Sequence, residues 1–345
     1  MNEFPDVIDS EEKLDELLSR PGEDVINMFS NVDGDLIFLG IAGKIGLSLA
    51  QMAKRACDEA GVKKKIIGVS QFSSADQREK IEKAGIETIK GDLLDINFIR
   101  KLPKLRNVFF LAGMKFGSVD NLSLTWAVNS FMPAMVAEHF ANSRIVTFST
   151  GCVYPLVPVG SGGSLESDIP HPVGEYAQSC LGRERMFEYG SNRFKTPVSI
   201  IRLNYSVELR YGVLVDIATK VKNKLPVNLD MGYFNVIWQG DSNDVVLRSL
   251  ELSRTPPKVL NITGPDTLSV REVALEFGQL MGTDVTFEGE EARTALLSNS
   301  REAYRLFSPP KVPISQVIKW TADWIARDGK TLGKPTRFEV RDGKY

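Results

Sequence analysis

The sequence predicts an α/β protein built on a Rossmann-type, doubly wound parallel sheet, with a smaller C-terminal domain attached to it. Three observations predict this fold. Short apolar runs alternate with stretches of helical periodicity, which is typical of parallel strands joined by crossover helices. A glycine-rich loop joins the first of these runs to the first long helical stretch. The chain of 345 residues is also long enough to bury one large interior or two packed domains.

The expected strands are continuous runs of apolar or β-branched residues, as in strands covered by helices on both faces. They are residues 36–39, 66–69, 86–89, 108–111, 145–148 and 198–201. The longest expected helices are residues 45–59, 122–140 and 176–189. Right-handed crossovers through such helices would build a single sheet.

The first 34 residues precede this regular pattern and are interpreted as a helical extension. A short acidic helix is expected over residues 9–20, with Asp9 as its N-cap and Glu12 in the capping-box position. Pro21 and Gly22 end it, and a second short helical stretch follows.

The chain therefore divides into three parts. The boundaries we expect are 1–34 for the extension, 35–203 for the Rossmann domain with a returning segment at about 234–264, and 204–233 with 265–345 for the C-terminal domain.

The composition excludes several classes of function. Lysine and arginine number 42 and aspartate and glutamate 44, so no strong field favours nucleic acid or an anionic membrane as a partner. The cysteines are odd in number and widely spaced, which suits reduced thiols. The two histidines form no Cys/His pair with zinc spacing, so we expect no metal site. No apolar stretch approaches the roughly 18 residues of a membrane span, so we expect a cytoplasmic protein.

The glycine loop is the clearest chemical motif. Gly40, Gly43 and Gly46 lie directly between the first expected strand and a helix. The first permits a tight turn, the second lets backbone N–H groups approach a diphosphate, and the third lets the helix pack close to the strand. This arrangement predicts a dinucleotide site, which would include Lys44 and Ile45 of the same loop.

The end of the second strand leaves the form of the dinucleotide open. It continues into Ser70 and Gln71 with no carboxylate, so nothing there repels a 2′-phosphate, yet no arginine holds one. NAD and NADP both remain possible, and the neutral end slightly favours NADP. After the third strand, Asp92 and Leu93 are expected at the adenine, where Asp92 would accept a bond from the amino group. An equally good interpretation makes Asp92 a helix N-cap.

Several stretches, in order, resemble the extended short-chain dehydrogenase/reductase family of nucleotide-sugar epimerases and dehydratases over roughly residues 35–285. These stretches are the glycine loop, Asp92-Leu93, Phe110-Leu111-Ala112-Gly113, Asn129 within a helix, Phe148 to Tyr154, Gly174-Glu175-Tyr176, Ile201 to Asn204 and Val259 to Gly264. The resemblance implies that Leu111, Ala112, Gly113 and Asn129 contact an NAD(P) cofactor. It also implies a homodimer formed through the helices at 122–140 and 176–189.

The same resemblance implies the catalytic residues. Thr150, with Ser149 beside it, would bind the substrate oxygen, and Tyr176 would act as acid/base while also contacting the cofactor. A tyrosine with a pKa near 10 needs a nearby cation to act as a base at neutral pH. The family supplies a lysine four residues after the tyrosine, but Cys180 stands here.

Three explanations of this cysteine stay open. Hydride chemistry has been lost, or another cation serves, or the thiol has a new role. Lys115 is the best candidate for the second explanation, because Leu111 to Gly117 follows the fourth strand beside the expected cofactor crevice. Arg183, one turn beyond Cys180, is the other candidate.

On the substrate side, the resemblance places Asn204 near substrate hydroxyls or phosphates, and Arg210 could bind an anionic group or be a solvated loop charge. The C-terminal domain would bind the substrate, which we expect to be a sugar, nucleotide sugar or sugar acid. The leading hypothesis is an NAD(P)-dependent oxidoreductase or epimerase. Dehydration fits least, since Gly151 and Cys152 replace the family's acidic pair. The alternative is a dinucleotide-binding protein without catalysis that senses redox state or binds a partner.

Overall fold

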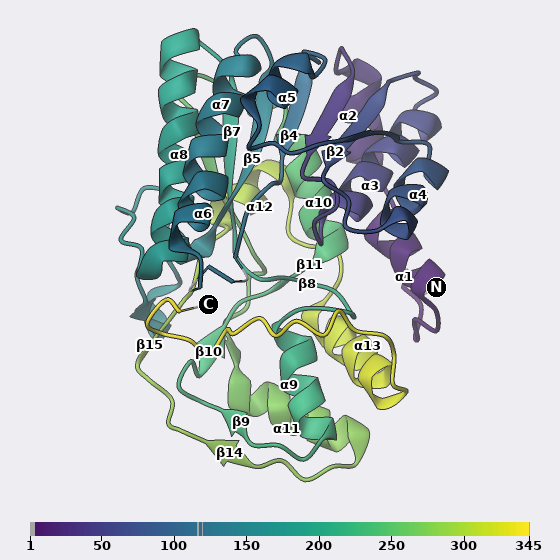
Figure 1. Cartoon of the computed structure of the whole chain (residues 1–345). Coiled ribbons are helices and arrows are strands. Elements are labelled where there is room, and N and C mark those ends of the chain that lie inside the picture. The colour runs from purple at the N-terminus through teal and green to yellow at the C-terminus, as the bar shows by residue number, and fades with distance from the viewer. Residues whose placement is uncertain (1–3, 116, 119, 345) are drawn as a thin grey trace.

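A parallel sheet forms the centre of the protein in a computed structural model that describes residues 4–115, 117–118 and 120–344 (Figure 1). Within these residues the sheet has seven strands in the order β12-β7-β5-β4-β1-β2-β3. The strands are β1 (Leu36–Leu39), β2 (Ile66–Ser70), β3 (Glu87–Lys90), β4 (Asn107–Phe110), β5 (Arg144–Thr150), β7 (Val198–Leu203) and β12 (Lys258–Ile262). Every neighbouring pair runs parallel. The predicted doubly wound Rossmann sheet is confirmed, and the strand ends differ from the predicted ones by at most two residues.

Helices cover both faces of the sheet because its strands alternate their apolar side chains. Leu36 and Phe38 of β1 face one layer, whereas Ile37 and Leu39 face the other. The first layer contains α2 (Glu23–Asn31), α3 (Gly46–Glu59), α10 (Gln239–Arg248) and α12 (Arg301–Phe307), and the second contains α5 (Ile96–Lys101), α7 (Met132–His139) and α8 (Gly174–Phe194). A further helix, α4 (Ala75–Lys83), connects β2 to β3.

The expected helix over 122–140 is interrupted by a wider turn. It consists of α6 (Leu122–Trp126), a π-helical turn (Ala127–Phe131) and α7. The turn lies just before Pro133, which has no N–H to continue the regular ladder. Asn129 lies within this turn and is fully buried.

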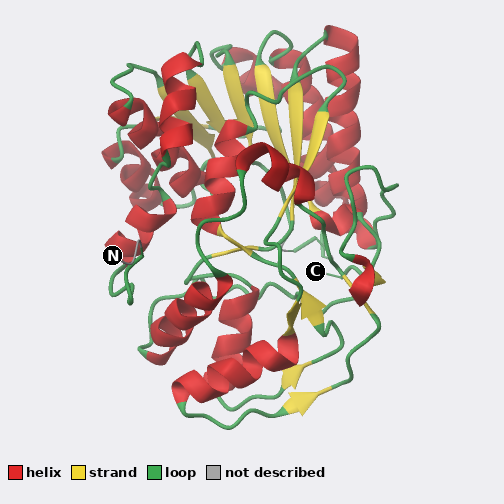
Figure 2. Cartoon of the chain, turned by 180° about the vertical axis from the view of Figure 1, so that it is seen from behind, coloured by secondary structure: helices red, strands yellow, loops and turns green. Residues whose placement is uncertain are grey.

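The C-terminal part forms a second core below the sheet (Figure 2). Its main helices are α9 (Val213–Lys222), α11 (Val270–Met281) and α13 (Ile314–Ala326). Two-residue strands form small two-stranded sheets beside this core. These strands are β6 (Val157–Pro158), β8 (Ser206–Val207), β9 (Val227–Asn228), β10 (Tyr233–Phe234), β11 (Ile237–Trp238), β13 (Leu268–Ser269), β14 (Phe287–Glu288) and β15 (Thr294–Ala295).

The expected returning segment needs a correction. β10 pairs with β13 and β11 pairs with β8, so the apolar run at 234–238 does not enter the main sheet. Phe234 and Trp238 instead pack in the second core. Only β12, at the end of that segment, returns to the sheet beside β7.

The N-terminal extension is integrated into both cores. Its first helix, α1 (Glu11–Leu18), places Leu14 in the second core, whereas α2 places Phe29 in the core on one face of the sheet. The predicted cap was wrong: Ser10, not Asp9, is the N-cap, and its Oγ accepts a hydrogen bond from the Lys13 N–H at 3.2 Å. Membrane-spanning helices are absent from the described residues, where every helix is too short or too polar.

The close packing of the glycine loop gives a first prediction. A Cβ added at Gly46 would collide with the Ile41 carbonyl and lie 2.8 Å from the Ile41 Cα. We expect Gly46→Ala to lower the free energy of unfolding by about 1–3 kcal/mol, measured by urea denaturation. Gly160 is the matched control because a Cβ there meets nothing within 4 Å, and Gly160→Ala should stay within about 0.5 kcal/mol of wild type. Equal effects of the two variants would contradict the packing argument.

Candidate active site

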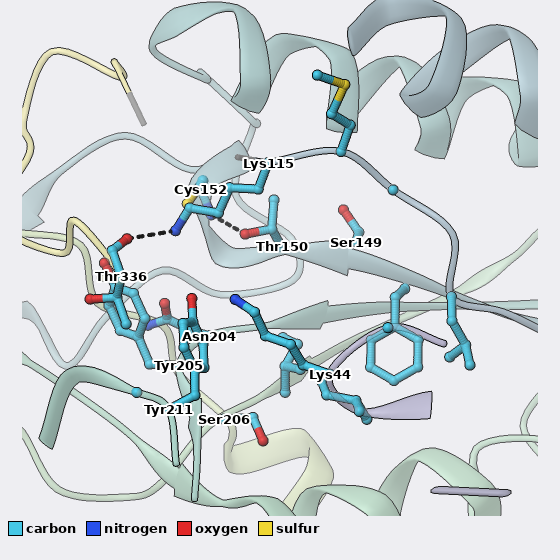
Figure 3. Close-up of a pocket in the computed structure, with 18 of the residues that line it drawn as sticks. Lys44, Lys115, Ser149, Thr150, Cys152, Asn204, Tyr205, Ser206, Tyr211 and Thr336 are labelled. Carbon is cyan, nitrogen blue, oxygen red and sulfur yellow. Dashed lines mark hydrogen bonds between the residues drawn. The ribbon is translucent and has the colours of Figure 1, made fainter. Parts of the chain in front are cut away.

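A cavity of about 480 Å³ lies at the carboxyl edge of the parallel strands, between the sheet and the C-terminal part (Figure 3). Residues that follow β1, β4, β5 and β7 line it, which is where open α/β sheets bind ligands. The C-terminal segment lines it too, through Lys334 and Thr336.

The glycine loop forms one wall of this cavity. Gly40 has a φ of +91°, and a Cβ there would lie 2.6 Å from the Ala112 backbone nitrogen. Gly43, Lys44, Ile45 and Gly46 line the cavity at the start of α3. The first and third glycines thus hold the loop against neighbouring backbone, while the second opens into the cavity.

A residue that the sequence analysis missed supports this loop. Gln77 of α4 donates from its side-chain amide to the Ala42 carbonyl at 2.7 Å. No sequence signal pointed to Gln77, because its contact spans 35 positions of the chain.

The residues expected near the adenosine lie outside this cavity. Ser70 ends β2, Gln71 is exposed beyond it, and Leu93 is buried. Asp92 accepts a bond from the Leu94 N–H at 2.8 Å. The alternative in which Asp92 caps the following turn agrees with this bond, although α5 itself is capped by Asp95, which accepts a bond from the Asn97 N–H.

Asn129 fixes the loop that follows β4. Its Oδ1 accepts from the Met114 N–H at 2.9 Å and its Nδ2 donates to the Met114 carbonyl at 2.8 Å. Leu111, Gly113 and Lys115 of this loop line the cavity, and Ala112 packs against Gly40. Phe116, within the stretch from Leu111 to Gly117, lies outside the described residues.

Arg183 of α8 reaches the same loop. It donates to Asn129 Oδ1 at 2.6 Å and to the Phe148 carbonyl at 2.9 Å. Its guanidinium lies against Gly113, where a Cβ would be 2.5 Å from its Nη2. Both hydrogen-bond acceptors are neutral, so they do not cancel its positive charge at the cavity wall.

Tyr176 enters the cavity from α8, and its hydroxyl hydrogen-bonds to the thiol of Cys180 one turn further on. Burial raises the pKa of Tyr176 well above its usual value, while Arg183 acts in the opposite direction. Burial also raises the pKa of Cys180 to about 11. The thiol is therefore neutral at physiological pH and does not supply the charge of the missing lysine.

Lys115 supplies a cation near Tyr176. Its Nζ lies 5.9 Å from the centroid of the Tyr176 ring and donates to the Thr336 carbonyl at 3.0 Å. Burial lowers the pKa of Lys115, and Cys152 and Asp216 act in the opposite direction. Lys115 and Arg183, the two cations considered for this role, thus both line the cavity with Tyr176.

The two hydroxyls at the end of β5 differ in their partners. Ser149 donates to Glu184 Oε1 at 2.5 Å, so its single hydrogen is committed to that carboxylate. Thr150 Oγ1 instead accepts from the Cys152 N–H at 3.1 Å, which leaves its own hydrogen to donate elsewhere. Ser149, the residue expected beside Thr150 in the catalytic set, is thus occupied by Glu184, whereas Thr150 has a hydrogen to donate.

Behind Ser149 lies a buried charge network. Glu184 receives two hydrogen bonds from Arg202, at 3.0 and 2.7 Å. Arg202 also donates to the Tyr154 hydroxyl at 2.7 Å, and that hydroxyl donates to Asn261 at 2.9 Å. The network joins α8, β5, β7 and β12 directly behind the cavity.

The substrate-side residues are only partly brought together. Asn204 lines the cavity and donates to Asn235 at 2.7 Å. Arg210 is not among the lining residues and forms ion pairs with Glu11, Asp15 and Glu208. The expectation that Arg210 binds an anionic substrate group is therefore wrong, because these carboxylates neutralise it and fasten α1 to the C-terminal part.

Comparison with known proteins was made on sequence and on structure. The chain matches no protein-family model and no curated protein sequence. Its structure, however, superimposes on UDP-glucuronic acid 4-epimerase from Bacillus cereus, solved with UDP-glucuronic acid and NAD, with a TM-score of 0.71 and 17% identity, over 85% of this chain and 99% of that chain.

Two further solved structures give the same result. UDP-glucose 4-epimerase from Thermotoga maritima has a TM-score of 0.70 at 17% identity, over 85% of this chain and 99% of that one. An epimerase from Methanothermobacter thermautotrophicus has a TM-score of 0.71 at 20% identity, over 91% of this chain and 100% of that one. The chain has the same fold as these epimerases. The resemblance inferred from the short motifs is thus confirmed at the level of the fold.

The buried network behind Ser149 gives a second prediction. Glu184→Gln leaves the Arg202 charge buried without its counter-charge, so we expect a loss of about 3–5 kcal/mol in unfolding free energy. The control is Glu188→Gln, which removes the partner of Arg185 in an exposed pair and should cost less than about 0.5 kcal/mol. Chemical denaturation of both variants checks this, and a mild Glu184→Gln effect would refute the network's structural role.

A third prediction concerns pH. Asp216 accepts bonds from the Thr336 N–H at 2.7 Å and from its hydroxyl at 2.5 Å, and burial raises the pKa of Asp216 from 3.8 to about 6. The folded state therefore keeps a proton that the unfolded chain loses, and this contribution to stability falls as pH rises from about 4 to 6.

Asp216→Asn removes this titration but keeps an oxygen acceptor for Thr336. We expect its stability, relative to wild type, to rise by about 1–3 kcal/mol between pH 4 and pH 7. Denaturation curves at several pH values measure this change. The control is Asp328→Asn, at a side chain that is 91% exposed. If the stability of wild type and of Asp216→Asn changed in parallel with pH, the prediction would be contradicted.

Proposed function

We propose that this protein is an NAD(P)-dependent enzyme that oxidises a hydroxyl of a sugar-like substrate, as an epimerase or an oxidoreductase. The observation that carries the proposal is the convergence of Thr150, Tyr176 and Lys115 on one cavity whose wall is the glycine loop. The solved epimerases with this fold support it, since one of them is a complex with UDP-glucuronic acid and NAD.

The geometry of the loop fits the diphosphate of a dinucleotide. Gly40 and Gly46 have no space for a side chain, whereas Gly43 opens into the cavity beside the first turn of α3. Backbone N–H groups at such a helix start favour a diphosphate. Bound there, a nicotinamide dinucleotide would supply a hydride acceptor.

Residues of the chain would transfer the proton of the substrate hydroxyl. Thr150 would donate its hydroxyl hydrogen to the substrate oxygen, and Tyr176 would take the proton that this oxygen loses. A phenolate in this buried place needs cations, and Lys115 and Arg183 are the groups present to stabilise it. The charge of the family's lysine would thus come from the loop after β4 and from another position on α8.

A specific observation favours a second candidate, a dinucleotide-binding protein without hydride transfer. In this structure the Tyr176 hydroxyl is bonded to Cys180, and its pKa is raised. Catalysis requires a substrate oxygen to replace the thiol as the partner of Tyr176. A protein in which this exchange does not occur would bind the cofactor only.

The form of the cofactor is part of the proposal. Ser70, Gln71 and Ser73 bring no carboxylate to the end of β2, and Arg78 of α4 is paired with Glu82. The neutral end slightly favours NADP, and dissociation constants for NAD and NADP decide between them. NAD binding at least about tenfold tighter than NADP would reject this preference.

We also propose the homodimer and the domain roles implied by the resemblance. Phe131 of the π-helical turn and Tyr189 of α8 are each 59% exposed beside a groove, which supports packing against a second copy. The Rossmann part would hold the cofactor, and the C-terminal part would close over the substrate.

A fourth prediction tests the catalytic assignment. Purified protein with bound cofactor is assayed for reduction or isotope exchange with a panel of sugars and sugar acids. Tyr176→Phe should lower the turnover by about 10²–10⁴-fold, because it removes the group that transfers the proton, and Lys115→Met should lower it as well. Tyr189→Phe, at an exposed site on the same helix, should leave turnover unchanged.

The cofactor content of each variant separates the two candidate functions. Wild type that retains cofactor but shows no exchange with any sugar supports the binding protein. Normal turnover in both Tyr176→Phe and Lys115→Met would refute the assignment, and wild type that binds no dinucleotide would refute both candidates.

A further inference from the structure

The cavity is lined by basic side chains without any acidic one. Among the described residues that line it, the charged ones are Lys44, Lys115, Arg183 and Lys334. Like charges gathered in a partly enclosed space repel one another, and burial strengthens this repulsion. Such a cavity is built for a ligand that carries negative charge.

Lys44 is the least expected of these cations. Its backbone belongs to the glycine loop, yet its side chain crosses the cavity, and its Nζ lies 3.3 Å from the centroid of the Tyr211 ring. Figure 3 shows the ammonium directed towards Asn204 and Tyr205, which follow β7, and away from the loop itself. The lysine therefore presents its charge to the side of the cavity opposite the expected diphosphate.

The surroundings of Lys44 favour an anion beside it. Burial, Lys115 and Lys334 together lower the pKa of Lys44 to about 7, and the more distant Asp216 compensates only in part. Asp216 does not line the cavity, and its carboxylate accepts two hydrogen bonds from Thr336. A ligand anion between Lys44 and Lys334 would raise the pKa of Lys44 again.

We propose that Lys44, with Lys334 on the facing C-terminal segment, binds an anionic group of the substrate. The chemistry is that of a carboxylate or a phosphate ester on a sugar. The substrate class is then an acidic or phosphorylated sugar, with its charged group between these lysines and its reacting hydroxyl at Thr150 and Tyr176. The inference rests on the proposed function for the reaction, whereas the anion site stands on its own contacts.

The diphosphate of the cofactor is the competing partner for Lys44. Backbone N–H groups at the start of α3 are placed to bind that group, and they do so without a side chain. The cation–π contact with Tyr211 holds the ammonium on the C-terminal side of the cavity. If the substrate anion is the partner, a substitution of Lys44 weakens sugar binding. If the cofactor diphosphate is the partner, the same substitution weakens cofactor binding.

The test is calorimetric titration of the cofactor-loaded protein with D-glucuronate, D-glucose 6-phosphate and D-glucose. Wild type should bind at least one of the two anionic sugars about tenfold or more tightly than glucose. Whichever anion is preferred identifies the carboxylate or the phosphate as the group recognised.

Lys44→Gln should weaken binding of that anion by at least about tenfold and leave glucose binding and cofactor affinity within about twofold. Lys44→Arg should retain most of the affinity, and Lys334→Gln should also weaken anion binding because Lys334 lines the same cavity. The control is Lys104→Gln, at an exposed lysine outside the cavity.

Three results would overturn the proposal. These are no preference of wild type for either anion, an equal loss of glucose and anion affinity in Lys44→Gln, and a loss confined to cofactor affinity. Tyr176→Phe separates this proposal from the proposed reaction, because it should abolish turnover yet keep the anion affinity. In the wild-type protein, anion binding without any turnover would refute the proposed reaction and leave the anion site intact.

Discussion

The buried pairing of Glu184 with Arg202 is the interaction on which the arrangement of the site depends. A carboxylate and a guanidinium removed from water must satisfy each other, and their two hydrogen bonds fix α8 against β7. Glu184 also accepts from Ser149 at the end of β5. The position of α8 sets the position of Tyr176, so a pair that does not touch the cavity determines where its phenol lies.

Cys180 on α8 leaves positive charge near Tyr176 to come from other positions. Where the epimerase resemblance implies a lysine, Cys180 provides a neutral thiol within reach of Tyr176. Positive charge reaches the phenol from Lys115 on the loop after β4 and from Arg183 one turn along the helix. The proposed proton transfer requires positive charge near the phenol, whichever element carries that charge.

The C-terminal segment joins the two halves of the protein across the cavity. Thr336 bonds to Asp216 of α9 through its N–H and hydroxyl, and to Lys115 through its carbonyl. Lys334, two residues earlier, brings a further cation to the cavity. The segment therefore shapes both the charge and the size of the space that a substrate would occupy, and it is drawn between the two halves in Figure 1.

The sequence by itself determined the fold and the chemistry that is local in the chain. The alternating apolar runs predicted the strands, since strands covered on both faces must be apolar. The spacing of Gly40, Gly43 and Gly46 predicted the tight loop, because a side chain at the first or third position collides with backbone. The motifs also brought Thr150, Tyr176 and Lys115 together correctly as residues of one cavity.

Only the tertiary structure decided which polar side chains are already satisfied. Arg210 resembled a ligand for an anion until the fold brought Glu11 and Asp15 to it from the far end of the chain. Ser149 resembled a substrate donor until α8 presented Glu184. The contact of Lys44 with Tyr211 and the position of Lys334 at the cavity likewise depend on contacts between distant segments. Hydrogen bonds and ion pairs act over a few ångströms in space, so the spacing of residues along the chain does not predict those between distant segments.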